Sequence, residues 1–480
     1  MAFSKSPSKD TYQTKPLKLI WSLFNKETIT REEAVAVNGF FEIIRDKVSR
    51  DDDYKFVKRS GVSAYPYSLS SAIRGLYYWE DQDKLFIAEN TNIYIVTGSS
   101  GILVTAVTPF TTTTGEVGFT EFNYEDGTTK VVAGDGTRLV TIDSANTVVV
   151  GSSPDQPTAF QPSIIFLDGY LFLIKTGTAD IYNSALNDPL TFVAGDFLTA
   201  EMLPDTLFRI SRLNNYLVAF GSSSVEYFFD AGNATGSPLQ RNDTPVKHLG
   251  FLGGLASVAN KIFFVGQSQT TAPEVFMLED FKIESLSPPA MRRQMQSSSV
   301  FYASIISMKG RDFYCLSFDS FTYMMDIETK LWTKQKLAGA PNFPIVYATN
   351  IPISGKGNCS VFSIASSVNL FVLDPTSYID TGGMFTVSVT TYKATFETMR
   401  QKFGSRFLVR ADRSSGNLAI SWTDDDYQTF STPRNVDLAS PRPRLHQLGK
   451  FTDRSFRFEY THNASLTLLD TEIDFNIGAS

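Results

Sequence analysis

The sequence has few of the residues from which disulfide frameworks, metal sites and membrane spans are built. Its 480 residues include 2 cysteines and 3 histidines. Two cysteines are too few for a disulfide framework, and His248, His446 and His462 lack the spacing of zinc ligands. No run of about 18 apolar residues could span a bilayer, and the N-terminus lacks the apolar run of a secretory signal. These absences predict a protein made in a cytoplasm, without metal or other cofactor, in which Cys315 and Cys359 are buried apolar side chains.

Excess basic charge and the common catalytic motifs are also missing. The chain has 43 Lys and Arg against 50 Asp and Glu, a net charge of −7, so it offers no basic field for gripping nucleic acid. It contains neither a Gly-x-Ser-x-Gly elbow nor a Walker-type phosphate loop. Aspartate runs at 51–53 and 424–426 lack the alternating spacing of a calcium loop and are expected in solvated loops. No residue is therefore assigned a catalytic, cofactor-binding or metal-binding role, and we expect no enzyme.

The chain does contain a repeated β-hairpin. Aromatic residues, which favour strands, are common, with 39 Phe and 20 Tyr. A four-stranded propeller blade takes about 40–50 residues, and the spacing of the hairpins agrees with that length. It therefore predicts an all-β fold with a β-propeller of six or seven blades, the alternative being an irregular array of β-sandwiches. Seven apolar hairpins with short polar turns begin 40 to 51 residues apart, at Leu85, Lys130, Tyr170, Tyr216, Lys261, Asp312 and Ser360.

Changes in pattern divide the chain into three parts. In residues 1–75, the alternation at 34–37 and an Asn-Gly turn at 38–39 favour strands, although Thr30 and Glu33 also fit a helix capping box. Residues 76–382 hold the seven hairpins. Residues 383–480 contain strands that alternate apolar and polar side chains, which predicts a C-terminal β-sandwich.

One acidic turn near the C-terminus resembles the Asp-box of sialidase blades. It spans Ser421 to Phe430, and in such turns the acidic residue caps a hairpin, which is a structural role even in enzymes. A glycosidase also needs two convergent carboxylates, which a linear sequence does not show. A carbohydrate-binding or glycoside-cleaving propeller is therefore the alternative function. A lectin would repeat binding residues from blade to blade, and the seven turns here differ in length and content.

The fourth hairpin and its surroundings resemble a known family. The region from Tyr216 to Gln267 contains Phe-Gly-Ser-Ser at 220–223, Val-Glu-Tyr-Phe at 225–228, a Gly/Ala/Thr-rich loop at 231–236 and a Lys-x-x-Gly turn at 247–250. This order resembles the tail hub, or nozzle, proteins of short-tailed bacteriophages (podoviruses), also called packaged-DNA stabilisation proteins. Weaker similarities are Arg74-Gly75 within Ser71 to Tyr77, the strand and acidic turn at 418–430, Leu448-Gly449-Lys450 and Phe456-Arg457-Phe458.

This resemblance implies a structural virion protein without enzymatic activity. Proteins of this family form six-fold rings below the portal and its adaptor ring, continue the DNA channel, carry tail fibres or tailspikes and receive a needle or plug at the tip. The resemblance implies strands on the adaptor-proximal side for residues 1–75. An acidic chain suits such a conduit, because duplex DNA must pass without sticking. We therefore expect a homohexamer of the phage tail, assembled in the host cytoplasm, whose channel-lining and partner-binding residues the sequence does not identify.

Overall fold

The computed structural model describes residues 12–17, 19, 35–44, 53–200, 202–203, 205–233, 235–365 and 367–478. Their helices and strands are almost all β-strands, with one short helix, α1 (Pro289–Met295), and one 3-10 turn, η1 (Glu80–Gln82). The all-β fold class expected from the sequence is confirmed. The capping box considered at Thr30 and Glu33 lies outside the described residues, as do Asp51 and Asp52.

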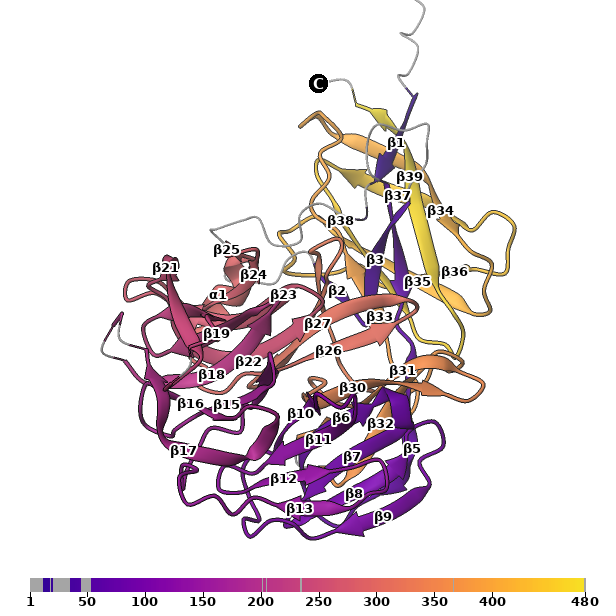
Figure 1. The fold of residues 1–480 in the computed structure, drawn as a ribbon. Helices are drawn as coiled ribbons and strands as arrows, with labels where there is room; N and C mark the ends of the chain where they lie inside the picture. Colours follow the sequence, from indigo (N-terminus) through magenta and orange to yellow (C-terminus); the bar gives the residue numbers. More distant parts are fainter. Residues whose placement is uncertain are drawn as a thin grey trace, which may run out of the picture.

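Most of the strands form four-stranded antiparallel blades that follow one another around a ring (Figure 1). Blade 1 consists of β6 (Ile73–Trp79), β7 (Lys84–Glu89), β8 (Asn92–Thr97) and β9 (Leu103–Val107). Blade 2 consists of β10 (Gly118–Asn123), β11 (Thr129–Gly134), β12 (Leu139–Ile142) and β13 (Val148–Val150). Blade 3 consists of β14 (Ile165–Leu167), β15 (Tyr170–Ile174), β16 (Asp180–Ala185) and β17 (Asp188–Thr199). Blade 4 consists of β18 (Leu207–Leu213), β19 (Tyr216–Gly221), β20 (Val225–Asp230) and β21 (Leu239–Lys247). Blade 5 consists of β22 (Gly250–Val258), β23 (Lys261–Gln267), β24 (Glu274–Glu279) and β25 (Lys282–Ser285). Blade 6 consists of β26 (Tyr302–Met308), β27 (Arg311–Phe318), β28 (Phe321–Asp326) and β29 (Trp332–Lys334).

The seventh blade is completed by a strand from the other end of the chain. Its strands β30 (Ile345–Ile353), β31 (Gly357–Ile364) and β32 (Asn369–Asp374) pair in this order, and β5 (Gly61–Ser68) pairs with β32 as the outermost strand. The inner strand β30 also contacts β6 of blade 1. The propeller therefore has seven blades, and pairing between the two ends of its sequence closes the ring.

The seven hairpins recognised in the sequence are the two central strands of the seven blades. Central strands are covered on both faces by neighbouring blades, so β19 and β23 are buried over nearly their whole length. Outer strands such as β9 and β25 are largely exposed. A strand buried on both faces is apolar throughout and easy to recognise, whereas a short exposed strand has little periodicity.

Glycine sets how closely each inner strand approaches the next blade. A Cβ atom on Gly75 of β6 would lie well inside 3.0 Å of the carbonyl oxygen of Val117, and one on Gly118 of β10 would do the same with Pro162. Both obstacles are backbone atoms of the following blade, which cannot turn away as a flexible side chain can. A side chain at either position would therefore push two blades apart.

Two further sheets pack face to face beside the propeller. Buried side chains from both sheets, among them Phe41, Phe407 and Phe456, share one core. One sheet has the order β3 (Gly39–Ile44), β4 (Asp53–Lys58), β39 (Thr467–Ile477), β34 (Lys402–Ala411) and β37 (Arg444–Phe451), with β1 (Tyr12–Leu17) paired to β39. The other contains β2 (Ala36–Val37), β33 (Val387–Thr390), β38 (Ser455–Tyr460), β35 (Asn417–Thr423) and β36 (Arg434–Asp437).

Strand pairing divides the N-terminal region differently from the expected boundary at residue 75. Strands β1 to β4 belong to the sandwich, β5 completes blade 7, and β6 begins blade 1 at Ile73. The physical reason is that short strands do not form a stable unit alone and leave their edges unsatisfied. They therefore pair with β39, β33 and β32, which lie more than three hundred residues later in the chain.

Strand β2 joins the propeller to the sandwich through the backbone. It pairs in parallel with β29, the outer strand of blade 6, and antiparallel with β33, so blade 6 and one sandwich sheet form a single nine-stranded sheet. Asn38 extends the link. Its N–H donates to the carbonyl oxygen of Lys334 (2.9 Å), and its side-chain oxygen accepts from the N–H of Lys336 (2.8 Å).

A buried cluster of charges lies at the same junction. The side chains of Arg59 and Asp380, each 1% exposed, form two hydrogen bonds of 2.8 and 2.7 Å. The neighbouring Lys58 is also fully buried. Its ammonium donates to the carbonyl oxygen of His462 (2.6 Å) and lies 4.5 Å from the centre of the Phe385 ring. Burial, together with the charge of Arg59, lowers the pKa of Lys58 to about 8, and Asp380 opposes this only in part.

The lowered pKa of Lys58 predicts that stability rises with pH in a defined window. Below about pH 8 the ammonium is charged in the folded protein and its burial opposes folding in full. Between about 8 and 10.5 the folded protein loses this proton before the unfolded chain does, so the free energy of unfolding increases with pH. In Lys58→Met this increase, on the order of 1–3 kcal/mol, should be absent. Urea unfolding at a series of pH values checks the slope.

The matched control for this measurement is Lys330→Met, because Lys330 is an exposed lysine paired with Glu284 on the surface. This variant should keep the wild-type slope between about pH 8 and 10. If Lys58→Met also kept the slope, the charge at this junction would not be the origin of the pH dependence.

Candidate functional site

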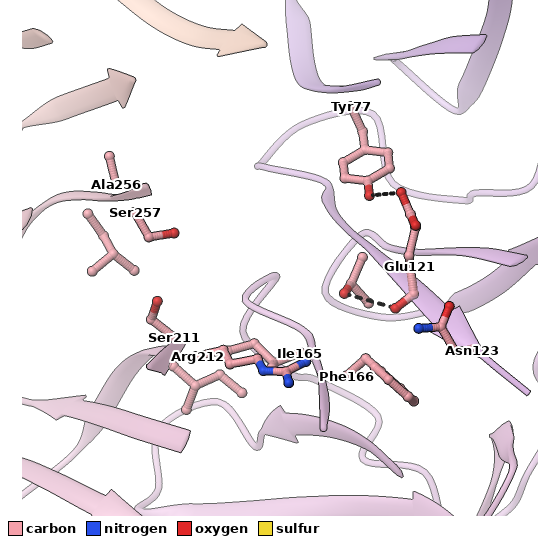
Figure 2. A pocket seen from close by; sticks show the side chains of 12 residues that line it. Tyr77, Glu121, Asn123, Ile165, Phe166, Ser211, Arg212, Ala256 and Ser257 are labelled. Atoms are coloured by element: carbon pink, nitrogen blue, oxygen red, sulfur yellow. Dashed lines mark hydrogen bonds between the residues drawn. The ribbon is translucent and has the colours of Figure 1, made fainter. Parts of the chain in front are cut away.

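The inner strands of the blades enclose the axial channel of the propeller. Near the end of the channel where these strands terminate, a pocket of about 550 Å³ is lined by side chains of β6, β10, β14, β18 and β22 (Figure 2). They include Tyr77, Glu121, Phe166, Arg212 and Ser257. Five consecutive blades contribute to this pocket, so it depends on their arrangement around the axis.

Two polar side chains of this pocket, Tyr77 and Glu121, bind each other. The Tyr77 hydroxyl donates to the Glu121 carboxylate (2.6 Å), across blades 1 and 2 (Figure 2). Burial raises the pKa of Tyr77 far above its ordinary value, and the hydrogen bond to Glu121 adds to this effect. Arg212 donates to the carbonyl oxygen of Asn214 (2.7 Å). The tyrosine therefore serves as a hydrogen-bond donor between blades.

A larger pocket, of about 800 Å³, lies where the inner strands begin. An ion pair between Arg209 and Glu116 lies in it. The exposed apolar side chains of Phe208, Leu252 and Tyr302 line the same pocket. This end of the channel therefore combines a neutralised charge pair with apolar surface.

Among the described residues, each of the two channel pockets offers a single carboxylate and not the pair that glycosidases use. Glu121 binds Tyr77 of the neighbouring blade 1, and Glu116, which precedes blade 2, pairs with Arg209 of blade 4. Glycosidases use two carboxyl groups about 5–9.5 Å apart. Volumes of this size fit small molecules.

The segment Tyr216 to Gln267 forms the junction between blades 4 and 5. Asp205 caps its hairpin turn, because its carboxylate accepts from the N–H of Ser223 (2.8 Å) and from the hydroxyl of Ser224 (3.1 Å). Glu226 of β20 is fully buried, and the Ser224 hydroxyl lies 3.3 Å from its carboxylate. Burial raises the pKa of Glu226. The sequence pattern of this segment therefore specifies how a blade turns and packs.

Arg74-Gly75 has a comparable structural use. The buried Arg74 side chain donates to the carbonyl oxygens of Gly115 (2.8 Å), Thr112 (2.8 Å), Thr114 (2.7 Å) and Asn90. Three of these carbonyl groups belong to the connection between blades 1 and 2, and the fourth belongs to the turn between β7 and β8. One guanidinium group therefore holds three carbonyl groups of the connection between blades 1 and 2.

The acidic turn at 424–426 is a structural element of the sandwich. Asp425 accepts from the hydroxyl of Thr423 (2.7 Å) and from the N–H of Thr429 (2.9 Å), and these hydrogen bonds hold the pKa of Asp425 well below its ordinary value. Asp424 forms two hydrogen bonds of 2.7 Å with the buried Arg454. Asp424, Asp425 and Asp426 are exposed residues of a turn, as expected. Asp425 also caps this turn, and Asp424 neutralises a buried cation.

The remaining residues considered in the sequence are dispersed. His248, His446 and His462 lie on different elements, and the described part of the chain contains no cluster of three or more potential metal ligands. Cys315 and Cys359 are both buried and unpaired, as expected, and burial raises the pKa of Cys315 to about 12. None of the helices in the described ranges has the length and apolar character needed to cross a membrane.

Residues 71–318 match the family Phage_stabilise, described as bacteriophage P22 Gp10, beta-propeller. The match covers more than half of the chain, from just before β6 to the end of β27. The chain belongs to the Phage_stabilise family. Ser71 to Tyr77 and Tyr216 to Gln267 lie inside the matched region, so the resemblance drawn from them is confirmed. The weaker C-terminal similarity lies outside it.

Membership of the Phage_stabilise family makes this chain a structural protein of a bacteriophage and a component of its virion, from a family that stabilises packaged DNA. The Arg74 cluster and the capped turn at Asp205 are therefore features of a phage propeller. The axial-channel roles of Tyr77, Glu116 and Glu121 could not be recognised from the sequence, because a single channel-facing residue has no motif.

Solved structures with a similar fold are distant. The N-terminal domain of Nup159 is 8% identical, with 71% of this chain and 98% of that chain covered at a TM-score of 0.43. Virginiamycin B lyase from Staphylococcus aureus is 10% identical, with 65% and 98% covered at a TM-score of 0.43. The Cps50 (Swd1) propeller of Myceliophteria thermophila is 7% identical, with 64% and 98% covered at 0.41. Such values support no functional conclusion. A search of curated proteins found no significant match.

Proposed function

We propose that this chain is the subunit of a tail hub, or nozzle, of a short-tailed phage. Six copies form a ring below the portal and its adaptor, extend the DNA channel and retain packaged DNA. Tail fibres or tailspikes attach to its outside, and a needle or plug protein is a further partner. The observation that carries the proposal is the Phage_stabilise match over residues 71–318.

In this assembly DNA passes through the centre of the ring of subunits and not through the axial channel of a single propeller. The pockets of the axial channel measure about 550 and 800 Å³, and the Tyr77–Glu121 and Arg209–Glu116 contacts lie in them. The net charge of −7 disfavours tight binding of the phosphate backbone, which would need clustered Lys and Arg. DNA is therefore a cargo that slides past the subunits without specific contacts.

Closure of the propeller supports a role in a particle that must resist the pressure of packaged DNA. A ring closed by pairing of β5 with β32 opens only if that pairing breaks. Strand β2 and the Arg59–Asp380 pair connect the same region to the sandwich. A subunit built in this way transmits force through hydrogen-bonded sheets and a buried ion pair.

The test is the mass and symmetry of the purified full chain, alone and with the portal–adaptor complex of its phage, by light scattering and negative-stain imaging. A six-fold ring that forms on the adaptor is the expected result. A chain that stays monomeric, ignores the adaptor and binds or cleaves glycans would contradict the proposal and favour a carbohydrate-active propeller.

A further inference from the structure

Exposed apolar side chains are concentrated at the outer edge of blades 1 and 2. Ile102, Leu103 and Val104, at the start of β9, are 66%, 47% and 46% exposed. Val149 and Val150 of β13 are 49% and 42% exposed. Strands β9 and β13 are the outer strands of neighbouring blades, on the side of the propeller away from the sandwich (Figure 1). Together these side chains form an apolar edge on one side of the molecule.

The outer strands of other blades are protected in ways that β9 and β13 are not. Soluble proteins protect an edge strand with charges, proline or a covering segment. Strand β25 carries Lys282 and Glu284, β5 has an exposed Pro66, and β29 is covered by β2. The sequences of β9, LVTAV, and of β13, VVV, contain neither charge nor proline. This contrast within one propeller indicates that the edge of blades 1 and 2 is covered in the assembled particle.

The first three blades also carry the negative charge of the protein. Residues 73–199 contain 15 acidic and 5 basic side chains, a net charge of −10. The remaining residues contain 35 acidic and 38 basic side chains, a net charge of +3. A partner surface complementary to this apolar edge and its acidic surroundings would be apolar and basic.

The sandwich presents such a surface on β37, the edge strand of its six-stranded sheet. Arg444 and Lys450 are exposed on β37, and the exposed Arg442 precedes it. On the adjacent strand β34, Arg406 and Arg410 form ion pairs with carboxylates of β39. Within the described ranges, by contrast, no carboxylate forms an ion pair with Arg442, Arg444 or Lys450. These three cations therefore keep their charge available for a partner.

An apolar side chain stands beside these cations. Phe403 of β34 is 48% exposed and pairs in register with Lys450. The surface formed by Phe403, Arg442, Arg444 and Lys450, named here the β37 surface, is thus complementary to the edge of blades 1 and 2 in charge and in apolar character. The two surfaces lie at opposite ends of the molecule (Figure 1), so they meet only between two copies.

We infer that β9 and β13 of one copy dock on the β37 surface of the next copy, an inference that rests on the proposed ring. The contact is head to tail, because it joins two different surfaces, and contacts of this kind generate rings when the rotation closes. Apolar burial stabilises the contact, and the opposite charges align the two copies as they meet. Neither the apolar part nor the charged part of this contact involves the axial channel.

Cross-linking between engineered cysteines tests the pairing directly. Both native cysteines are buried, so Val149→Cys and Lys450→Cys each provide one reactive thiol. Under conditions in which the wild-type chain forms its ring on the adaptor, a short bis-maleimide should link the two variants when they are mixed and should link neither variant to itself. Linkage within Val149→Cys alone would show a symmetric contact and overturn the inference, as would absence of linkage in an intact ring.

Charged substitutions test the same contact energetically. The double variant Val104→Glu/Val149→Glu should raise the concentration needed for ring formation at least tenfold, and Arg444→Glu/Lys450→Glu should do the same. Val368→Glu, an exposed apolar position in the turn between β31 and β32, is the matched control and should change assembly by less than about twofold, as expected of a neutral surface site. Circular dichroism and melting temperature establish that each variant is folded.

Three outcomes contradict the inference without affecting the proposed function. If Val104→Glu/Val149→Glu forms a normal ring but no longer holds the tail fibre, the edge of blades 1 and 2 serves that partner instead. If Arg444→Glu/Lys450→Glu forms a normal ring but releases DNA, the β37 surface contacts DNA. If both variants assemble and function as wild type, neither surface is an interface. Failure of the wild-type chain itself to form a ring would instead contradict the proposed function.

Discussion

Asp380→Ala is expected to lower the free energy of unfolding by about 3–5 kcal/mol, because it leaves a fully buried guanidinium without its counter-charge. Arg59 donates two hydrogen bonds to Asp380, one to the carbonyl oxygen of Ser60 (2.9 Å) and one to that of Lys336 (2.8 Å). Its guanidinium also lies 3.8 Å from the centre of the Phe385 ring. Without the carboxylate, none of these neutral contacts compensates the loss of hydration.

The position of this pair makes the effect larger than for an ion pair within one sheet. Arg59 precedes β5, the strand that closes blade 7, and Asp380 follows β32, the strand with which β5 pairs. Asp380 also accepts from the N–H of Ala338 (3.0 Å), which lies beyond blade 6. Removal of the carboxylate therefore weakens ring closure and the connection to the sandwich together.

Urea unfolding of the full chain measures the loss, with Glu397→Ala as the control, because Glu397 is exposed and pairs with Lys15 on the surface. Exposed pairs contribute about 0–1 kcal/mol, so this control should unfold almost as the wild type does. The double variant Arg59→Met/Asp380→Leu should recover much of the loss, since it buries no unpaired charge. A double variant as unstable as Asp380→Ala would show that packing, and not the unpaired charge, dominates.

The propeller could be predicted because its central strands carry a strong signal. Hairpins such as Tyr170–Tyr182 and Tyr216–Phe229 are buried by neighbouring blades and are continuous in aromatic and aliphatic residues. Their spacing predicted blades of the right length. The number of blades was left between six and seven, because closure depends on β5, which lies more than three hundred residues before its partner β32.

The sandwich was predicted only in part. Strands β33, β34, β35, β38 and β39 were visible as segments that alternate apolar and polar residues. The contribution of β1 to β4 was not, because pairing between the two ends of a chain leaves no periodic trace in either end. The short strand β36 and the edge strand β37 were also missed, since their exposed residues are polar or charged and give a weak apolar pattern.

The family could be predicted from the sequence, whereas the exposed apolar edge of blades 1 and 2 could not. Phe-Gly-Ser-Ser and Val-Glu-Tyr-Phe identify the family because they specify a capped turn and a buried strand in one blade. The apolar edge at Leu103 and Val149 was inconspicuous in sequence, since apolar strand residues are normally buried. Only their exposure in the folded ring distinguishes them from core residues.

Arg74→Met is expected to lower the free energy of unfolding by about 3 kcal/mol or more and to loosen the connection between blades 1 and 2. The substitution keeps an apolar stem of similar length but removes donors to the carbonyl oxygens of Asn90, Thr112, Thr114 and Gly115. Each buried acceptor left without a partner costs about 1–3 kcal/mol, and water entering the connection would recover part of that amount.

Hydrogen exchange of the segment 108–117 measures this loosening, and urea unfolding measures the loss of stability. Arg212→Met is the matched control, because Arg212 lies in the channel and donates to one carbonyl oxygen, that of Asn214, in its own blade. It should change stability by less than about 1 kcal/mol. If Arg74→Met behaved like the control, the connection would be held by the close approach at Gly75 and by the backbone hydrogen bond from Val117 to Arg74 (2.9 Å), and not by the buried guanidinium.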